Sequence, residues 1–301
     1  MKRPASLLFY GSLLLAGGYA AVAAVFSVIE PRLVFPVRPV DDVTLREWET
    51  EQNATPLRLV TQDGVTLYGW RIGSAPKLVV IFTGNAASVG DNPARYKRFL
   101  DLGFSVLHVN YRGYPGSTGV PSEAGLRLDA GTIWTEALRT HTPNSIAVYA
   151  KSLGGGVAVG LVAGLHHDAQ PAALVLDSTF TSALAVATMS HPLLPVRWIM
   201  KNRFDSASLA PAIACPTLIV HGREDTTIPV EHGHELQRLI PGARIHTVPG
   251  GGHDDDLLAD PDTWQSVSEL LTRAVRQSSI PLEVVPDHSR GEQRVGGPGG
   301  G

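Results

Sequence analysis

Cysteine is almost missing from this chain, which has one, Cys215, among 301 residues. A single cysteine forms no internal disulfide and cannot build a cysteine-rich metal cluster. It lies just before Pro216 and an apolar run, so we expect a small buried side chain. The 11 histidines show no spacing that is typical of a zinc site. The sequence therefore predicts no metal.

Charge is also scarce and evenly balanced. Charged residues make up 18% of the chain, and the net charge is -3. A nucleic-acid-binding protein needs clustered positive charge, so the sequence gives no support for a nucleic-acid partner. The hydrophobic share of 44% is enough for one substantial core at this length.

The longest stretch without charge runs from Ala5 to Ile29. Its roughly 25 residues can cross a bilayer as a helix. Lys2 and Arg3 precede it, which favours a cytoplasmic N-terminus and a domain on the non-cytoplasmic side. Small residues at 21–23 also allow a cleaved signal peptide. Because the apolar run continues past that site, we favour a single-pass anchor over residues 1–29.

The middle of the chain alternates between strand-like and helix-like patterns. Asp63-Gly64 separates two short β patterns and predicts a hairpin. A helical period follows Ser122, and three prolines between Glu30 and Val40 predict an extended lead-in. Continuous apolar runs, typical of strands covered on both faces, occupy 78–82 and 105–109. Further central strands are predicted at 146–149, 173–176, 217–220 and 245–248. We therefore predict an α/β domain over residues 30–277, with a mostly parallel central sheet and helices on both faces.

Two segments depart from this alternation. Residues 181–214, rich in proline and apolar side chains, lie between two predicted strands. They form either a small cap with an acyl pocket or an ordinary helical crossover. Residues 278–301 are polar and end in a glycine-rich run, so we expect a disordered tail.

One stretch has the pattern of a nucleophile elbow. A β-branched run ends at Ser152, and Gly154 to Gly156 lead into an apolar helix. A sharp turn of this kind exposes the serine hydroxyl, and the N–H of Leu153 then faces the same site. The alternative is a glycine-rich helix start without chemistry.

A serine nucleophile needs a base and an acid. Asp225 follows one predicted strand, and His253 lies on a glycine-rich loop after the last strand. The chain order serine, aspartate, histidine is that of α/β-hydrolases. Asp225 could instead be a turn residue that caps a helix, and His253 an exposed loop residue. Asp177, at another strand end, is an alternative acid, and we expect the other histidines to be structural or solvated.

The loop after the strand at 78–82 is expected to supply a second oxyanion donor. The N–H of Asn85 is the candidate, with Ala86 as the alternative. Arg112 also follows a strand end. It could bind an acidic substrate group, but an ion pair that clamps a loop is the favoured interpretation.

Several linked motifs resemble the α/β-hydrolase superfamily, and within it the membrane-anchored branch of ABHD13 and Bem46-like serine hydrolases. The resemblance runs from about Glu30 to Ala274. The motifs are the segments at 82–86, 110–114, 117–123, 152–155, 177–182 and 204–206, together with the loops of Asp225 and His253. The resemblance implies nucleophile Ser152, acid Asp225, base His253 and no cofactor.

The chain departs from this branch at three positions. Thr83 stands where relatives usually carry histidine, and Ala150 replaces the first glycine of the elbow. Pro115 replaces a glycine after Tyr114. None of these changes removes a catalytic group, so they concern rate and substrate fit more than reaction class.

The resulting prediction is a membrane-bound serine hydrolase that cleaves carboxylic ester or related acyl bonds. The apolar anchor and the segment 181–214 favour a small-molecule or lipid-like acyl substrate. A peptidase of the same fold is the first alternative, because the triad does not separate esters from amides. A membrane-tethered scaffold without turnover is the second. The oligomeric state stays open.

Overall fold

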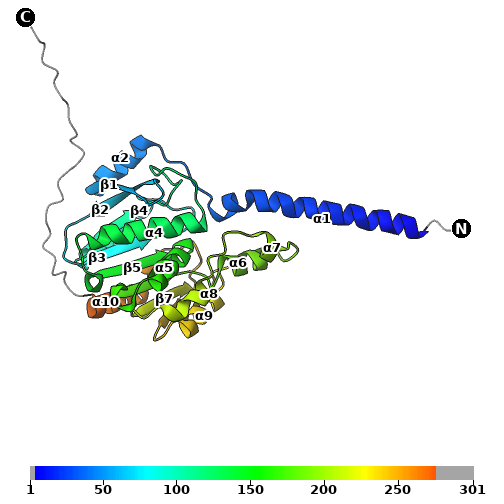
Figure 1. Ribbon diagram of the computed structural model, residues 1–301. Coiled ribbons are helices and arrows are strands. Elements are labelled where there is room, and N and C mark those ends of the chain that lie inside the picture. The colour runs from blue at the N-terminus through cyan, green and yellow to red at the C-terminus, as the bar shows by residue number, and fades with distance from the viewer. Residues whose placement is uncertain (1–3, 276–301) are drawn as a thin grey trace, which may run out of the picture.

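The computed structural model describes residues 4–275, in which a long N-terminal helix projects from an α/β body (Figure 1). This helix, α1 (Pro4–Val34), contains the window Gly17–Val34, which is long and apolar enough to cross a membrane. The tail expected to be disordered lies outside the described residues. The prediction of an extended lead-in from Glu30 is wrong up to Val34, because the helix continues through Pro31 and becomes irregular only afterwards.

Contacts at the base of α1 explain why the helix survives its proline. Glu30 is 1% exposed, and its carboxylate accepts hydrogen bonds from Asn202 N at 2.9 Å and Asn202 Nδ2 at 2.9 Å. The ring of Phe35 packs against Phe204, with centroids 6.2 Å apart. Interior proline disfavours a helix, so these tertiary contacts must outweigh its cost. They also fix the direction in which α1 leaves the body.

A second helix, α2 (Asp42–Glu51), was not predicted. Its N-cap is Asp41, whose side chain accepts hydrogen bonds from the N–H groups of Val43 and Thr44, both at 2.9 Å. Among its ten residues only Leu45 is fully buried. A helix with so small an apolar face gives little periodic signal in the sequence.

Eight strands form one sheet in the order β1-β2-β4-β3-β5-β6-β7-β8. The first two make the predicted antiparallel hairpin, and β2 also pairs antiparallel with β4. All other pairings are parallel, which confirms the predicted topology. The strands are β1 (Ala54–Val60), β2 (Thr66–Ile72), β3 (Leu78–Phe82), β4 (Ser105–Val109), β5 (Ile146–Lys151), β6 (Ala173–Asp177), β7 (Thr217–Gly222) and β8 (Arg244–Val248).

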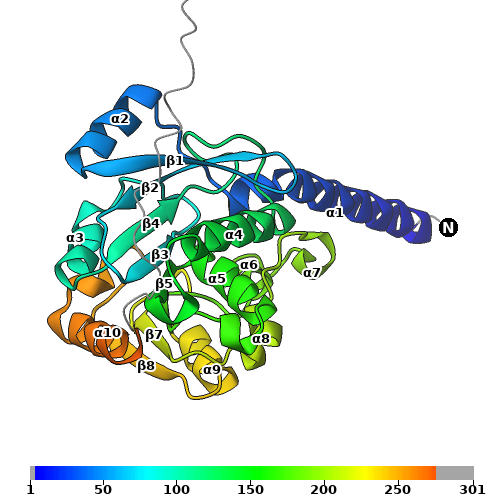
Figure 2. The same ribbon diagram turned by 60° about the vertical axis from the view of Figure 1, so that its left-hand side comes forward.

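Helices cover both faces of the sheet, as predicted (Figure 2). On β3, Val80 packs into the apolar cluster beneath α4 (Glu123–Leu138), α5 (Leu153–Gly164) and α9 (Glu231–Leu239), and Val79 into the cluster beneath α3 (Pro93–Asp101) and α10 (Pro261–Ala274). Successive residues of a strand point to opposite faces, so the continuous apolar runs follow from burial on both sides. Short 3-10 turns lie at Pro143–Ser145, His167–Ala169, Ala210–Ala212 and Leu257–Ala259.

The segment 181–214 contains three short helices, α6 (Ala183–Ser190), α7 (Val196–Ile199) and α8 (Ser206–Leu209). The first two project from the body beside α1 (Figure 1). Tyr19 Oη donates a hydrogen bond of 3.2 Å to the carbonyl oxygen of Leu193, and the ring of Phe26 lies 5.5 Å from that of His191. The first part of the segment therefore rests against α1, whereas α8 packs on the body beside α5 and α9.

Arg112 forms the clamp that the sequence favoured. Its Nη1 lies 2.7 Å from Asp63 Oδ2, and its Nη2 lies 2.8 Å from Asp129 Oδ1. Hydrogen bonds from the Arg112 guanidinium hold the pKa of the Asp63 carboxyl well below its ordinary value. The arginine thus ties the β1–β2 turn to α4, which confirms the ion-pair interpretation.

Candidate active site

Ser152 occupies a strained turn between β5 and α5. Its backbone has φ 53° and ψ −120°, and α5 begins with the next residue, Leu153. A positive φ is unfavourable for a residue with a Cβ, and such conformations persist only where neighbouring structure enforces them. Here the Ser152 N–H donates to Asp177 O at 2.8 Å, and its carbonyl accepts from Thr179 Oγ1 at 2.8 Å. Both contacts tie the turn to the end of β6.

The glycines after the serine are required by close backbone contacts. A Cβ on Gly154 would lie 2.2 Å from the carbonyl oxygen of Phe82, and one on Gly155 would lie 2.1 Å from Thr179 Oγ1. No side chain fits at such distances, so α5 can start this close to β3 and β6 only with glycine there. Ala150, the departure at the first elbow position, is fully buried in the apolar core.

The three residues predicted as a triad lie in hydrogen-bonding contact. Ser152 Oγ is 3.0 Å from His253 Nε2, and His253 Nδ1 is 2.8 Å from Asp225 Oδ2. They come from three loops that follow β5, β8 and β7. The carboxyl ends of parallel strands meet at one edge of a sheet, which brings residues 101 and 28 positions apart into contact.

Asp225 serves both the loop and the histidine. Its Oδ1 accepts hydrogen bonds from Thr227 N at 2.9 Å and Ile228 N at 2.7 Å, while Oδ2 faces His253. Burial raises the pKa of Asp225, but hydrogen bonds from His253 and Ile228 outweigh it, so the pKa lies below its ordinary value. Asp225 therefore caps the turn with Oδ1 and contacts His253 with Oδ2, so both interpretations of this residue apply.

The alternative acid, Asp177, is engaged elsewhere. It is fully buried, accepts hydrogen bonds from the Tyr149 hydroxyl and from Ser178 Oγ, and lies 3.6 Å from Lys151 Nζ. Its backbone carbonyl holds Ser152 N, as described above. Asp177 therefore supports the serine turn, whereas Asp225 is the carboxylate in contact with His253.

His221 belongs to the surroundings of the site, although from the sequence it was expected to be structural or solvated. Its side chain is buried behind Asp225, with Nε2 at 2.7 Å from Ile228 O and 3.6 Å from Asp225 Oδ2. Burial lowers the pKa of His221, so the ring is neutral and donates from Nε2 to the carbonyl. It helps to shape the loop on which Asp225 lies.

Two tyrosines hold the loop that carries the oxyanion candidates. Tyr111 Oη donates to Thr83 O at 3.2 Å, and Tyr114 Oη donates to Asn85 O at 2.6 Å. These contacts fix the peptide units on both sides of the bond between Gly84 and Asn85. In the sequence the tyrosines stand out only as part of a motif, because nothing local to them indicates a partner almost thirty residues away.

Two cavities meet at the serine and histidine, which line both. The first, of about 370 Å³, is polar, and Arg38, Lys151 and Asp254 are among its lining residues. The second, of about 350 Å³, has a largely apolar wall formed by α1 and α6. Asn85 lines both cavities and Leu153 the second, so the oxyanion candidates border the same space as Ser152. The serine therefore lies between a polar and an apolar compartment.

Metal ligands do not gather in the described part of the chain. Among residues 4–275, no group of three or more histidine, cysteine, aspartate or glutamate side chains is placed to hold a metal ion. Cys215 is buried, and burial raises the pKa of its thiol to about 11.

The chain has known relatives in sequence and in fold. The chain is 37% identical over 214 residues to the uncharacterized protein Rv2307c of Mycobacterium tuberculosis, a match that covers 66% of this chain and 72% of that one. Its fold matches a crystal structure of an α/β-hydrolase from Vibrio vulnificus with a TM-score of 0.65 and 19% identity, over 77% of this chain and 87% of the other. The chain therefore has the α/β-hydrolase fold.

A second relative of the chain has a name that states an activity. The chain is 29% identical over 225 residues to the lysophosphatidylserine lipase ABHD12 of Mus musculus. That match covers 69% of this chain but only 56% of the lipase, so the chain spans little more than half of that relative. No protein-family model matches the chain.

Proposed function

We propose that this chain is a membrane-anchored serine hydrolase that cleaves the carboxylic ester bond of a lipid-like amphiphile. The observation that carries the proposal is the hydrogen-bonded series Ser152, His253, Asp225 at the junction of a polar and an apolar cavity. An amphiphilic ester has the same division, with a polar group on one side of the carbonyl and an apolar chain on the other.

The proposed reaction has two steps. Ser152 Oγ attacks the ester carbonyl carbon while His253 Nε2 takes its proton, and the C–O bond to the leaving alcohol breaks as His253 returns that proton to the alcohol. Water then attacks the acyl-serine, again through His253, and releases the fatty acid and free serine. Asp225, kept ionised by its lowered pKa, orients the imidazole and stabilises its protonated form.

The N–H groups of Asn85 and Leu153 are the proposed donors to the oxyanion, with Ala86 N–H as the alternative to Asn85. Their residues border the serine, and the start of α5 adds the positive end of a helix dipole. A donor of this kind is worth about 3 kcal/mol in the transition state. Neither donation needs a cofactor.

The class of substrate is supported by the relatives and by the polar cavity. ABHD12 is named as a lipase for lysophosphatidylserine, an ester with one acyl chain and an anionic headgroup. Arg38 and Lys151 line the polar cavity and supply positive charge beside the serine. We therefore propose an anionic or zwitterionic polar group on that side of the ester.

The membrane location and the branch within the superfamily are further parts of the proposal. The window Gly17–Val34 is apolar enough to span a bilayer, and the linked motifs resemble ABHD13 and Bem46-like proteins. We propose an uncleaved anchor with the domain on the non-cytoplasmic side, as Lys2 and Arg3 suggest. Arg32 lies in the last turn of α1 and Arg38 just beyond the helix, so basic residues stand at both ends of the proposed anchor. A C-terminal topology reporter tests the orientation directly.

A fluorophosphonate probe tests the nucleophile. Ser152 Oγ would displace fluoride from phosphorus and form a stable adduct that mass spectrometry locates on one peptide. We expect labelling of the full chain at Ser152, and none in Ser152→Ala. An Asp225→Asn variant should label much more slowly, because the histidine then loses its orienting carboxylate. Folded protein that resists the probe would refute the hydrolase and favour a scaffold.

A panel of substrates then separates ester from amide cleavage. Long-chain esters with a phosphate-bearing headgroup should exceed both short acetate esters and peptide substrates in kcat/KM. Preference for peptides would move the assignment to the peptidase alternative.

A further inference from the structure

The apolar cavity beside the serine is bounded on one side by the membrane helix. On α1 its lining residues are Phe26, Glu30, Leu33 and Val34, and on α6 they are Ala183, Val186, Ala187 and Ser190. Each set repeats at intervals of three or four residues, the spacing that places side chains on one face of a helix. Two helix faces thus form opposite walls of a partly open cavity of about 350 Å³ that Ser152 also lines, and we call this cavity the channel.

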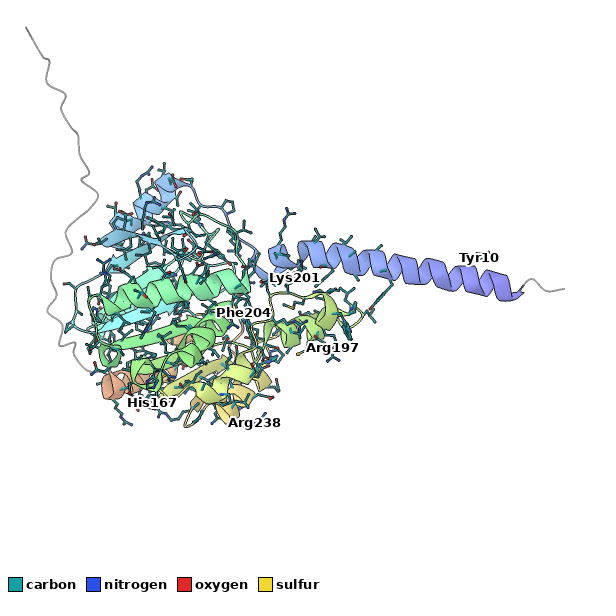
Figure 3. All side chains as sticks on the ribbon, in the orientation of Figure 1. Tyr10, His167, Arg197, Lys201, Phe204 and Arg238 are labelled. Atoms are coloured by element: carbon teal, nitrogen blue, oxygen red, sulfur yellow. The ribbon has the colours of Figure 1, made fainter. Side chains whose placement is uncertain are left out.

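The length of α1 allows its N-terminal part to lie in a bilayer while its C-terminal part packs on the body. A helix of 31 residues is about 46 Å long, whereas the hydrocarbon core of a membrane is about 30 Å thick. The excess can leave the bilayer and pack on the body, and the buried residues of α1 that the structure describes, Phe26 and Glu30, lie in its C-terminal third. Tyr10 lies toward the far end of the helix, well away from the body (Figure 3).

The tip of the segment between α6 and α7 is apolar and exposed beside α1. Leu193 is 85% exposed, Trp198 81% and Met189 55%. The contact from Tyr19 to Leu193 fixes this tip against the part of α1 that leads toward the membrane. Lys201 lies at the base of α1, and Arg197 lies on the side of α7 that faces away from α1 (Figure 3). An apolar tip with cations behind it is suited to the surface of a bilayer.

We propose that α1 is part of the substrate-binding site: the acyl chain lies between α1 and α6, and it enters this channel directly from the bilayer. The proposal rests on acyl hydrolysis at Ser152. It assigns α1 a second role, because Leu33 then contacts the acyl chain that Ser152 cleaves. It also explains why Tyr19, Phe26 and Glu30 bind the body so that the helix cannot turn away.

The depth of the channel should limit the length of the acyl chain that binds. Ala183 is 9% exposed and lies a full turn before Ala187 on the same face of α6. Four residues correspond to about 6 Å along the helix axis, so a large side chain at either position would stop an acyl chain at a different depth. Small residues at both positions leave the channel open.

Two fluorophosphonates, one with an ethyl tail and one with a dodecyl tail, test the assignment on the full chain in lipid nanodiscs. We expect Ala187→Phe and Leu33→Trp to slow Ser152 labelling by the dodecyl probe at least about tenfold, because the loss of a single methylene from a hydrophobic pocket already changes reaction rates by about this factor. Labelling by the ethyl probe should stay within about twofold. Thr188→Phe and Val28→Trp, exposed neighbours on the same helices, are the matched controls and should change neither rate.

The outcomes separate this inference from the proposed function. Ethyl-probe labelling of Ser152 with an unchanged dodecyl rate in both channel variants would overturn the inference and leave the hydrolase intact. Equal slowing of both probes would also overturn it, because the variants would then disturb the catalytic site and not the chain. Absence of labelling by both probes in the unaltered chain would remove the hydrolase, and the acyl channel with it.

Discussion

Tyr114 donates a hydrogen bond of 2.6 Å to the carbonyl oxygen of Asn85, from a loop that follows β4 to the loop that follows β3. Burial raises the pKa of Tyr114 well above its ordinary value, so the hydroxyl keeps its proton and remains a donor. The bond fixes the peptide between Asn85 and Ala86 beside Ser152. Tyr114 thereby positions the proposed oxyanion donors without facing the substrate itself.

Removal of this hydroxyl should therefore lower kcat more than it changes KM. We expect Tyr114→Phe to reduce kcat by roughly tenfold, less than the two to three orders of magnitude for the loss of a donor itself. Tyr111→Phe, which frees Thr83 O, is the comparison and should give a smaller loss because its bond is longer, at 3.2 Å. Steady-state kinetics on one ester substrate measure both. A rise in KM with unchanged kcat would contradict the positioning role.

The glycines of α5 allow a matched pair of substitutions in one helix. Gly155→Ala would place a Cβ at 2.1 Å from Thr179 Oγ1, so the start of α5 must shift and the Ser152 turn with it. Gly160→Ala meets nothing within 4 Å. We expect the first to cost about 1–3 kcal/mol of stability and most of the activity, and the second to stabilise by about 0.5–1 kcal/mol. Thermal unfolding and kcat of both variants test this difference, and equal melting temperatures would contradict the packing argument.

Arg38 should recognise the anionic part of the substrate. It lines the polar cavity from the segment just after α1. We expect Arg38→Ala to raise KM severalfold for an ester with an anionic headgroup and to leave KM for a neutral monoglyceride unchanged. Salt at about 0.5 M should reduce this difference between the two substrates, because it screens the charge of an exposed side chain. Arg46→Ala, exposed on α2, is the control. Equal effects on both substrates would show that Arg38 does not contact the headgroup.

The sequence predicted those parts of the site that depend on local pattern. The inner strands of the parallel sheet were visible because burial on both faces makes them continuously apolar, and Ser152 and Asp225 each follow such a strand. His253 follows β8, which was expected to be a central strand but lies at the edge of the sheet and is only partly buried. Contacts between distant segments left no such signal. Glu30 ended the uncharged stretch and was interpreted as the start of an extended lead-in, yet its burial depends on Asn202, more than 170 residues later.

The same limit explains the other differences. Tyr111, Tyr114 and His221 act on the site through backbone carbonyls of remote loops, which no spacing in the sequence reveals. The wall that α1 gives to the apolar cavity arises only when α6 packs beside it. Helix α2 was missed because its apolar face is a single buried residue. In each case tertiary packing, not local propensity, decides.

His108 should make the protein lose stability in mild acid. The ring is 1% exposed in β4, its Nδ1 lies 2.6 Å from Tyr96 Oη, and burial, with the charge of Arg95, lowers its pKa to about 3. The unfolded chain binds a proton at this histidine below about pH 6.5, whereas the folded chain stays neutral there. Its contribution to stability is therefore complete above that pH and is lost as the pH falls toward the folded value.

The loss should amount to about 1.4 kcal/mol per pH unit while only the unfolded chain is protonated. His108→Gln removes this dependence, although it lowers stability overall. Urea unfolding of the detergent-solubilised chain between about pH 4.5 and 6 measures how the free energy of unfolding changes with pH. This free energy should fall more steeply with decreasing pH for the unaltered protein than for the variant, by the equivalent of about one proton. Burial likewise lowers the pKa of His141, His221 and His232, but these contribute equally to both proteins and cancel in the difference. Parallel slopes would mean that His108 accepts a proton in the folded state.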